Sequence, residues 1–214
     1  MSLDDLHARN FQGLIVAGVD EVGRGPLAGP VVAAAVVVPE AMRAALLAVA
    51  GDSKVLSAKT RLKVAEMVHA GCGVGIGEAS VHEIDTVNIR NATFLAMRRA
   101  LEQVEHQAVV VDGNAKITEL SVPQVCVVGG DRVELAVACA SIVAKVYRDE
   151  LMAKLGESYP AYGWAKNAGY GTATHMQGLL SEGVCEHHRR SFAPIKDMIG
   201  MGAEEERASH AVAA

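Results

Sequence analysis

Short apolar runs, separated by glycine, proline or aspartate, constrain the fold of this chain most strongly. They occupy residues 14–19, 31–38, 72–79, 108–111 and 124–128. Runs of this length, most of them rich in valine, predict strands, and the Gly/Pro-rich turn after the first run predicts a hairpin. The chain is therefore expected to build a sheet that begins close to its N-terminus.

Longer stretches with helical spacing of apolar residues lie between the runs. Residues 57–70 are expected to form a helix with Ser57 as its N-cap, and residues 84–107 and 133–155 two longer helices. A short helix is expected at residues 174–180. Half of the residues are apolar but only 4% are aromatic, so small aliphatic side chains must fill the core. This pattern predicts an α/β fold in which helices pack closely on a sheet.

The 214 residues suffice for one domain with an appendage. We expect residues 1–13 to form a lead-in and residues 14–158 the core of the domain. Residues 159–199 are richer in Gly, Tyr, His and Arg, which predicts a C-terminal helical and loop segment. Residues 200–214 are expected to form a disordered tail.

Charge and cysteine content exclude several classes of function. A formal net charge of -5 argues against a protein that coats nucleic acid without specificity, although a local basic groove is allowed. The four cysteines form no C-x-x-C pair, which is typical of a reduced, cytoplasmic protein. No apolar run is long enough to cross a bilayer, and the first residues lack a signal peptide, so no membrane role is expected.

Acidic residues lie where predicted strands end: Asp20, Glu21, Asp112 and Asp131. That edge of an open α/β sheet is where ligands bind. Clustered buried carboxylates repel one another unless protons or cations neutralise them. All-oxygen ligands suit Mg²⁺ or Mn²⁺, and two such ions roughly 3.5–4 Å apart can activate water against a phosphodiester. The alternative is that each acid merely caps a turn or a helix.

The adjacent pair Asp20 and Glu21 poses a geometric problem. Neighbouring side chains on a regular strand point to opposite faces, so joint use of both acids predicts that the strand ends at Asp20. The following Gly23, Arg24 and Gly25 allow such a break, because glycine adopts backbone conformations closed to other residues. The same loop could present amide groups and the Arg24 charge to a phosphate or a hydroxyl.

Beyond these single features, the chain resembles the ribonuclease HII family, the type 2 ribonucleases H. The matching segments occur in the family's order: AGVDEVGRGPLAGP at 17–30, DSKVLS at 52–57, HEIDTVN at 82–88, VDGN at 111–114, ASIVAK at 140–145 and HHRRSF at 187–192. The resemblance extends over residues 14–194, far beyond a chance match to one short pattern.

The resemblance implies a ribonuclease H-like fold, with a mixed five-stranded sheet flanked by helices and a small helical C-terminal segment. It implies an endoribonuclease, expected to be monomeric, that cleaves the RNA strand of RNA/DNA hybrids with Mn²⁺ or Mg²⁺. It also implies cleavage on the 5′ side of a ribonucleotide embedded in duplex DNA, leaving a 3′-hydroxyl and a 5′-phosphate. Protein partners do not follow from it.

The same resemblance implies roles for individual residues. Asp20, Glu21 and Asp112 would bind metal and Asp131 would complete the catalytic site. The substrate would be held by Gly23, Arg24, Gly25, Lys54 and Tyr170. Within this set the Gly-Arg-Gly loop would sense the ribose 2′-hydroxyl, which separates RNA from DNA, and Tyr170 would pack on the following sugar.

Three positions depart from the family pattern. Gly129 stands where lysine is common, and Asn167-Ala168 replace a usual His-Lys, so positive charge near the substrate is reduced. The remaining candidates for holding the nucleic-acid backbone, besides Lys54, are Lys145, Arg148, Lys166 and Arg189. Solvated helix faces are the alternative explanation for them.

Other interpretations are less well supported. Asp149 is a possible fourth acid, but an ion pair on a helix surface explains it better. Cys185, His187 and His188 lack the second ligand pair that a zinc site needs. Among nucleases, a type 1 ribonuclease H or a Holliday-junction resolvase lacks the Asp-Glu pair followed by Gly-Arg-Gly, and ribonuclease HIII resembles a chain with an extra N-terminal domain. A non-catalytic binding module is disfavoured because its carboxylates would only repel anions.

Overall fold

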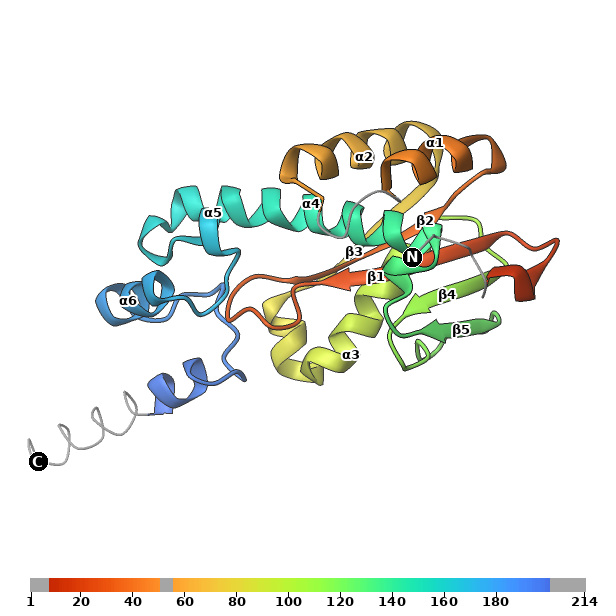
Figure 1. Ribbon diagram of the computed structural model, residues 1–214. Helices are drawn as coiled ribbons and strands as arrows, with labels where there is room; N and C mark the ends of the chain where they lie inside the picture. The colour runs from red at the N-terminus through yellow and green to blue at the C-terminus, as the bar shows by residue number, and fades with distance from the viewer. Residues whose placement is uncertain (1–7, 51–55, 201–214) are drawn as a thin grey trace, which may run out of the picture.

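A five-stranded mixed sheet forms the centre of the protein, whose computed structural model describes residues 8–50 and 56–200 (Figure 1). The strands β1 (Val16–Val22), β2 (Val31–Val37), β3 (Gly73–Ala79), β4 (Ala108–Asp112) and β5 (Gln124–Val127) lie in the order β3-β2-β1-β4-β5. β1 and β2 form the predicted antiparallel hairpin, and β3 extends it. β4 and β5 add in parallel on the other side of β1, which confirms the expected five-stranded mixed sheet.

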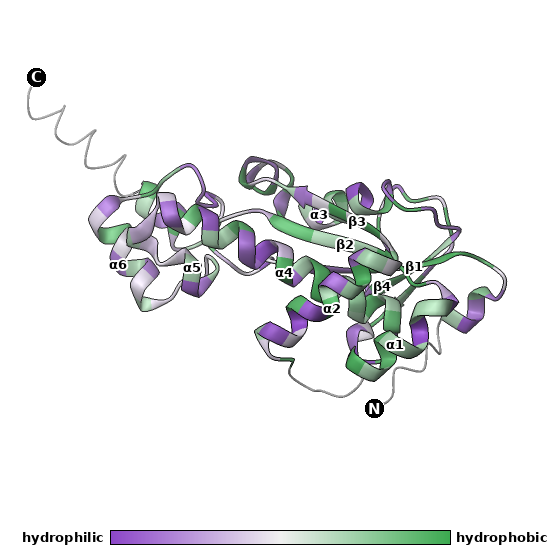
Figure 2. Cartoon of the chain, turned by 90° about the horizontal axis from the view of Figure 1, so that it is seen from above, coloured by the Kyte–Doolittle hydropathy of each residue, from purple (hydrophilic) through white to green (hydrophobic). Residues whose placement is uncertain are grey.

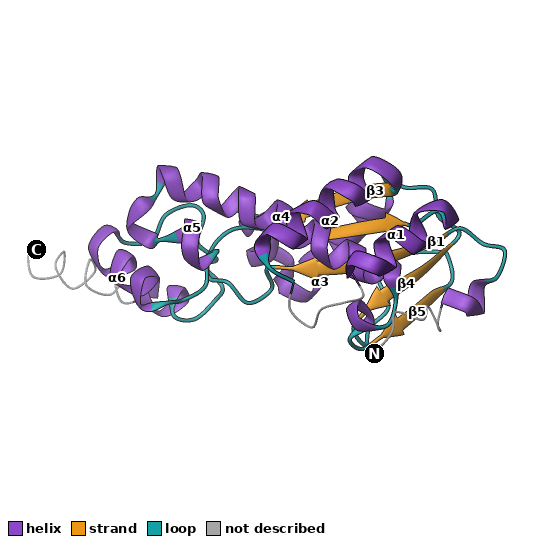
Figure 3. Ribbon diagram, turned by 45° about the horizontal axis from the view of Figure 1, so that its top comes forward, coloured by secondary structure: helices purple, strands orange, loops and turns teal. Residues whose placement is uncertain are grey.

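Helices cover both faces of the sheet, as an α/β fold requires. One face carries α3 (Val81–Leu101), and the other carries α1 (Glu40–Ala50), α2 (Ala58–Gly71) and α4 (Leu135–Ser158), as Figure 3 shows from a tilted view. Small residues allow this close packing. A Cβ at Gly18 would meet the α4 backbone at Ala136, and a Cβ at Gly77 would meet the α3 backbone at Ala96.

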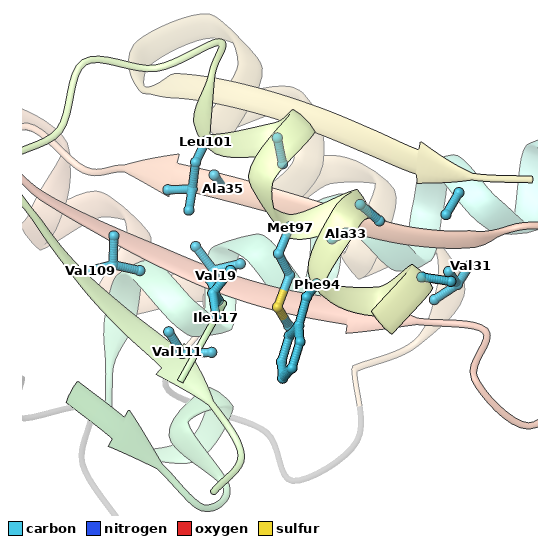
Figure 4. Packing of buried hydrophobic residues seen from close by; sticks show 14 of the residues in the cluster. Val19, Val31, Ala33, Ala35, Phe94, Met97, Leu101, Val109, Val111 and Ile117 are labelled. Carbon is cyan, nitrogen blue, oxygen red and sulfur yellow. The ribbon is translucent and has the colours of Figure 1, made fainter. Parts of the chain in front are cut away.

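The core between α3 and the sheet is built mainly from aliphatic side chains, with the buried ring of Phe94 among them. Figure 4 shows Val19 and Val111 of the strands facing Phe94 and Met97 of α3. Figure 2 shows the central strands coloured as hydrophobic along their length. The predicted filling of the core by Val, Ala, Leu and Ile is therefore confirmed.

The C-terminal segment forms a second, smaller hydrophobic cluster beyond the far end of α4 (Figure 1). It contains the 3-10 helix Pro160–Tyr162, α5 (Trp164–Asn167), α6 (Ala173–Glu182) and a final helical turn at residues 195–200. Its centre is the fully buried Trp164, packed against Tyr162 and Met152. No helix in the described ranges is long and apolar enough to cross a membrane.

Helix boundaries agree with the sequence in part. α2 begins after Ser57, whose side chain accepts a hydrogen bond from the Thr60 N–H, as predicted. The helix predicted at residues 84–107 instead runs from Val81 to Leu101, because Ser80 and Glu83 form a capping box at its start. The sequence prediction missed α1, although its alanines and leucines are strong helix formers.

Of the expected outer segments, the tail at 200–214 falls almost wholly outside the described residues, as does most of the lead-in at 1–13. Only Gly200 of the tail is described, and it lies in the final helical turn. Ala8–Phe11 of the lead-in forms a short 3-10 helix.

Candidate active site

The acidic residues of β1 and β4 lie at the same edge of the sheet. The parallel pairing of the two strands ends at Val19 and Val111, and Asp112 is the last residue of β4. The prediction that β1 ends at Asp20 is wrong, because its antiparallel pairing with β2 continues to Val22. The pairing of β1 with β4 stops at Val19, however. The two acids therefore lie where the β4 side of β1 has no neighbouring strand.

Asp20 and Glu21 therefore leave the strand on opposite faces. Asp20 extends toward α4, where it is 6% exposed, hydrogen-bonds the Ser141 side chain and accepts the Glu21 N–H at 2.7 Å. Glu21 extends toward α3 and lines a cavity of about 480 Å³. Asp112 also lines this cavity and interacts electrostatically with both acids, so it joins the two faces at the strand end.

Burial gives all three carboxyl groups unusual affinity for protons. It raises the pKa of Asp20 to about 7, and the charges of Asp112 and Glu21 add to the rise. Burial also raises the pKa of Glu21, although its bond with Arg24 acts in the opposite direction. The pKa of Asp112 is raised by burial first and then by the charge of Asp131, against a 2.7 Å hydrogen bond from the Gly130 N–H. Bound cations would relieve this repulsion.

Asp131 lies beside Asp112 in the short 3-10 helix Gly130–Arg132, which follows β5. Its N–H contributes a hydrogen bond to Asp112, and its exposed side chain acts on Asp112 through charge. The positive φ of Gly129, 69°, opens this turn, and a lysine at that position would meet strain there. The departure at Gly129 is thus compatible with the local backbone.

Each carboxylate has its own partner in this arrangement. Glu21 Oε1 lies 3.1 Å from Arg24 Nη1, while Asp20 and Asp112 accept main-chain N–H groups. Across the described ranges 8–50 and 56–200, no three acidic, histidine or cysteine side chains are grouped as ligands of one metal ion. The donor set nevertheless consists of carboxylate oxygens, which fits Mg²⁺ or Mn²⁺. The Arg24 contact uses only Oε1 of Glu21, so its second carboxylate oxygen could bind a metal ion.

The loop that carries Gly23, Arg24 and Gly25 is held in place by the buried guanidinium group of Arg189. Arg189 is 0% exposed and donates to the carbonyl oxygens of Gly23, Arg24 and Gly29. Gly23 has a φ of 90°, so glycine, rather than the acidic pair, is the residue that ends the strand. Burial lowers the pKa of Arg189 to about 9, which leaves it charged at neutral pH.

Arg148 likewise holds the neighbouring turns through main-chain carbonyl groups. It is 1% exposed and donates to the carbonyl oxygens of Ala28, Pro30 and Ala168. The suggestion that Arg148 and Arg189 hold the nucleic-acid backbone is therefore wrong, and so is the solvated-helix alternative. Both guanidinium groups donate their hydrogen bonds to main-chain carbonyl oxygens inside the protein. The sequence motif around Arg189 does not predict this structural role.

Tyr170 stands next to this loop from the C-terminal segment. Tyr170 is 49% exposed, and its Cε1 lies 3.5 Å from where a Cβ on Gly25 would be. The turn before it is organised by Asn167, whose side chain donates to Tyr162 O and accepts from Gly169 N–H. The Asn167 departure thus has a structural role, and Ala168 follows it at a positive φ of 49°.

The remaining basic residues and the histidine segment considered for zinc lie in different environments. Lys54 lies outside the described residues, and Lys166 is exposed on α5. Lys145 is paired with Asp149 at 2.5 Å, which confirms the helix-surface ion pair. His188 is buried, and its Nδ1 lies 3.0 Å from the Cys185 N–H, so this segment serves structure.

A mixed sheet in the order β3-β2-β1-β4-β5, covered by helices and bearing carboxylates in the last residues of β1 and β4, defines a ribonuclease H-like α/β protein. Solved structures agree. The ribonuclease HII of Archaeoglobus fulgidus, in complex with PCNA, superposes with a TM-score of 0.70 at 25% identity, covering 84% of this chain and 95% of that one. A Bst ribonuclease HIII in complex with Mn²⁺ shares the fold, with a TM-score of 0.72 at 21% identity over 92% of this chain and 72% of that one.

Sequence comparison narrows the class. The ribonuclease HII family profile matches residues 17–195. The ribonuclease HII of Paramagnetospirillum magneticum is 54% identical over 86% of this chain and 92% of its own length. That of Rhodospirillum rubrum is 53% identical over 94% of each chain. The chain belongs to the ribonuclease HII family and is a type 2 ribonuclease H, a hydrolase that acts on RNA/DNA substrates.

Proposed function

We propose that this enzyme cuts the RNA strand of RNA/DNA hybrids and also cuts duplex DNA on the 5′ side of a single embedded ribonucleotide. The products would carry a 3′-hydroxyl and a 5′-phosphate, and the biological role would be removal of ribonucleotides from DNA. The observation that supports the proposal best is the adjacency of two features. The acids Asp20 and Glu21 are followed directly by the loop of Gly23 and Gly25, against which the Tyr170 ring lies.

The carboxylate edge suits divalent metal ions. Asp20, Glu21 and Asp112 would hold Mn²⁺ or Mg²⁺, because burial and mutual repulsion raise the pKa of these three carboxyl groups and a cation would relieve both. Asp131 would complete the set. Bound ions would supply charge neutralisation, a more acidic attacking water and stabilisation of the leaving oxygen.

The chain's own residues would choose the ribonucleotide. A 2′-hydroxyl both donates and accepts hydrogen bonds, so a glycine loop with approachable backbone groups can test for it. The buried Arg189 holds that loop in place through its carbonyl groups. Tyr170 would pack on the sugar that follows, and a 2′-hydroxyl on that sugar would weaken this contact. Selection of an RNA-to-DNA junction would follow.

A substrate panel tests this proposal. With Mn²⁺ or Mg²⁺, the protein is expected to nick an end-labelled DNA duplex containing one ribonucleotide, to cut an RNA/DNA hybrid and to leave all-DNA duplex intact. Cleavage of the hybrid alone would disprove junction recognition. Binding of the hybrid without cleavage of any substrate would favour the non-catalytic module instead.

The proposal includes a cytoplasmic location and a monomeric state. Sedimentation equilibrium at micromolar concentration is expected to give a single species of 22.4 kDa. A concentration-dependent increase of that mass would contradict the monomer.

A further inference from the structure

A buried imidazole holds the main chain of Tyr170. His175, in the first turn of α6, has its Nδ1 3.0 Å from the Tyr170 carbonyl oxygen. Its other nitrogen, Nε2, lies 3.1 Å from Trp164 Nε1 and 3.0 Å from His188 Nε2. His175 is 0% exposed and His188 is 1% exposed, so both rings depend on protein partners.

The partners determine where the protons lie. Trp164 Nε1 can only donate, so His175 Nε2 accepts. The Cys185 N–H donates to His188 Nδ1 at 3.0 Å, which leaves the proton of His188 on Nε2, pointing at His175. The proton of His175 therefore lies on Nδ1 and is donated to the Tyr170 carbonyl. In this assignment each ring carries one proton, and the single lone pair of His175 Nε2 is shared between the Trp164 and His188 donors.

This assignment requires neutral rings, and the environment provides them. Burial lowers the pKa of His175, and burial together with the neighbouring His175 lowers the pKa of His188 to about 4. At neutral pH each ring therefore has one donor and one acceptor nitrogen.

Tyr170 itself combines a fixed main chain with a free ring. Its N–H donates to Asn167 O at 2.9 Å, and the carbonyl of the preceding Gly169 accepts from Leu27 N–H at 2.8 Å. The Tyr170 carbonyl oxygen accepts from the Thr172 N–H at 2.8 Å as well as from His175 Nδ1, so the backbone is held on both sides of the Tyr170 Cα. The residue as a whole is nevertheless half exposed, and its ring reaches Gly25.

From this geometry we infer that His175 is a positioning residue for ribonucleotide recognition: its Nδ1–H is the side-chain donor that, with the Thr172 N–H, holds the Tyr170 carbonyl and so directs the exposed side chain to the sugar beyond the Gly23–Gly25 loop. The inference rests on the proposed function, in which Tyr170 packs on that sugar. It assigns to His175 no contact with substrate or with the reacting atoms.

Two isosteric variants separate the two nitrogens of the ring. In His175→Asn the side-chain amide can replace the Nδ1 donor, whereas in His175→Gln the side-chain oxygen can replace the Nε2 acceptor. The measured quantity is the ratio of kcat/KM for the single-ribonucleotide duplex to kcat/KM for the hybrid. His175→Gln is expected to lower this ratio about fivefold, the effect of losing one hydrogen bond, and His175→Asn to lower it much less.

A double-mutant cycle with Tyr170→Ala identifies the route of the effect. If His175 acts through Tyr170, His175→Gln changes the ratio no further once the ring is gone. Equal losses in Asn and Gln variants, or additive losses in the cycle, would overturn the inference. If the wild-type enzyme fails to nick the single-ribonucleotide duplex, the proposed function fails first, so the two failures are distinguishable.

A measurement on the wild-type protein covers the case in which both variants unfold. Nitrogen-15 NMR of the imidazoles at pH 7 is expected to show His175 protonated on Nδ1 and His188 on Nε2. The reverse tautomer for His175 would remove its donor to Tyr170 and overturn the inference.

Discussion

Replacement of Asp20 by asparagine is expected to lower the rate of nicking by on the order of 10³-fold or more, because a group that holds charge at the reacting phosphate is lost. The same change is expected to stabilise the metal-free protein at pH 8 by about 2 kcal/mol, since the buried ionised carboxylate disappears. The side-chain oxygen can still accept the Glu21 N–H, so the fold is retained.

The stability gain depends on pH in a defined direction. The pKa of Asp20 is raised from 3.8 to about 7 by burial, so its ionised form opposes folding. The gain from asparagine is therefore largest above pH 7, declines as the pH falls and vanishes below about pH 4. Urea unfolding at several pH values in EDTA measures it.

Asp149→Asn is the matched control, because Asp149 is a partly exposed carboxylate paired with Lys145. It is expected to leave nicking and the pH dependence of stability unchanged. Mn²⁺ is expected to raise the melting temperature of the wild-type and Asp149→Asn proteins, but much less that of Asp20→Asn. Full activity of Asp20→Asn, or an equal Mn²⁺ effect on all three proteins, would contradict the site.

Replacement of Arg189 by methionine is expected to lower the free energy of unfolding by about 3 kcal/mol, because buried carbonyl groups lose their donor. The affected carbonyls belong to Gly23, Arg24 and Gly29, so the loop of residues 23–25 is destabilised first. Activity is expected to fall as well, even in variants that remain folded at low temperature. Chemical denaturation followed by circular dichroism gives the free energy.

Arg190→Met provides a control one residue away. Arg190 is exposed, and its main-chain N–H, which a substitution does not remove, is the group that bonds Asp85. The free energy of unfolding of this variant is expected to lie within about 0.5 kcal/mol of the wild-type value. Equal destabilisation by both substitutions would show that loss of positive charge, rather than loss of the carbonyl bonds, is responsible.

Most of the fold could be predicted from the sequence. Valine runs and turn residues gave the strands, and Ser57 predicted the start of α2, because these signals act over a few neighbouring residues. The position of Asp112 and Asp131 at one edge also followed, since β4 and β5 are parallel and their ends coincide. The capping box of Ser80 and Glu83 is a short-range signal of the same kind, and it places the start of α3 three residues before the predicted one.

The remaining features depend on contacts between distant segments. The strand continues past Asp20 because β2 pairs with it as far as Val22, which no local pattern announces. The burial of Arg148 and Arg189 arises only when the C-terminal segment meets the loop after β1, more than 100 residues away in the sequence. Arginine side chains are rarely buried, so a sequence alone predicts that both of them lie at the surface. The pairing of His175 with His188 also depends on tertiary structure, although the two residues are only 13 positions apart.

The most direct test of the central claim is the chemistry of the cut in a DNA duplex with one ribonucleotide. If the carboxylate edge directs water to the phosphate, mass spectrometry will find a 3′-hydroxyl on the upstream fragment and a 5′-phosphate on the fragment that begins with the ribonucleotide. A 2′,3′-cyclic phosphate on the ribonucleotide would mean that its 2′-hydroxyl is the nucleophile, and would contradict the account.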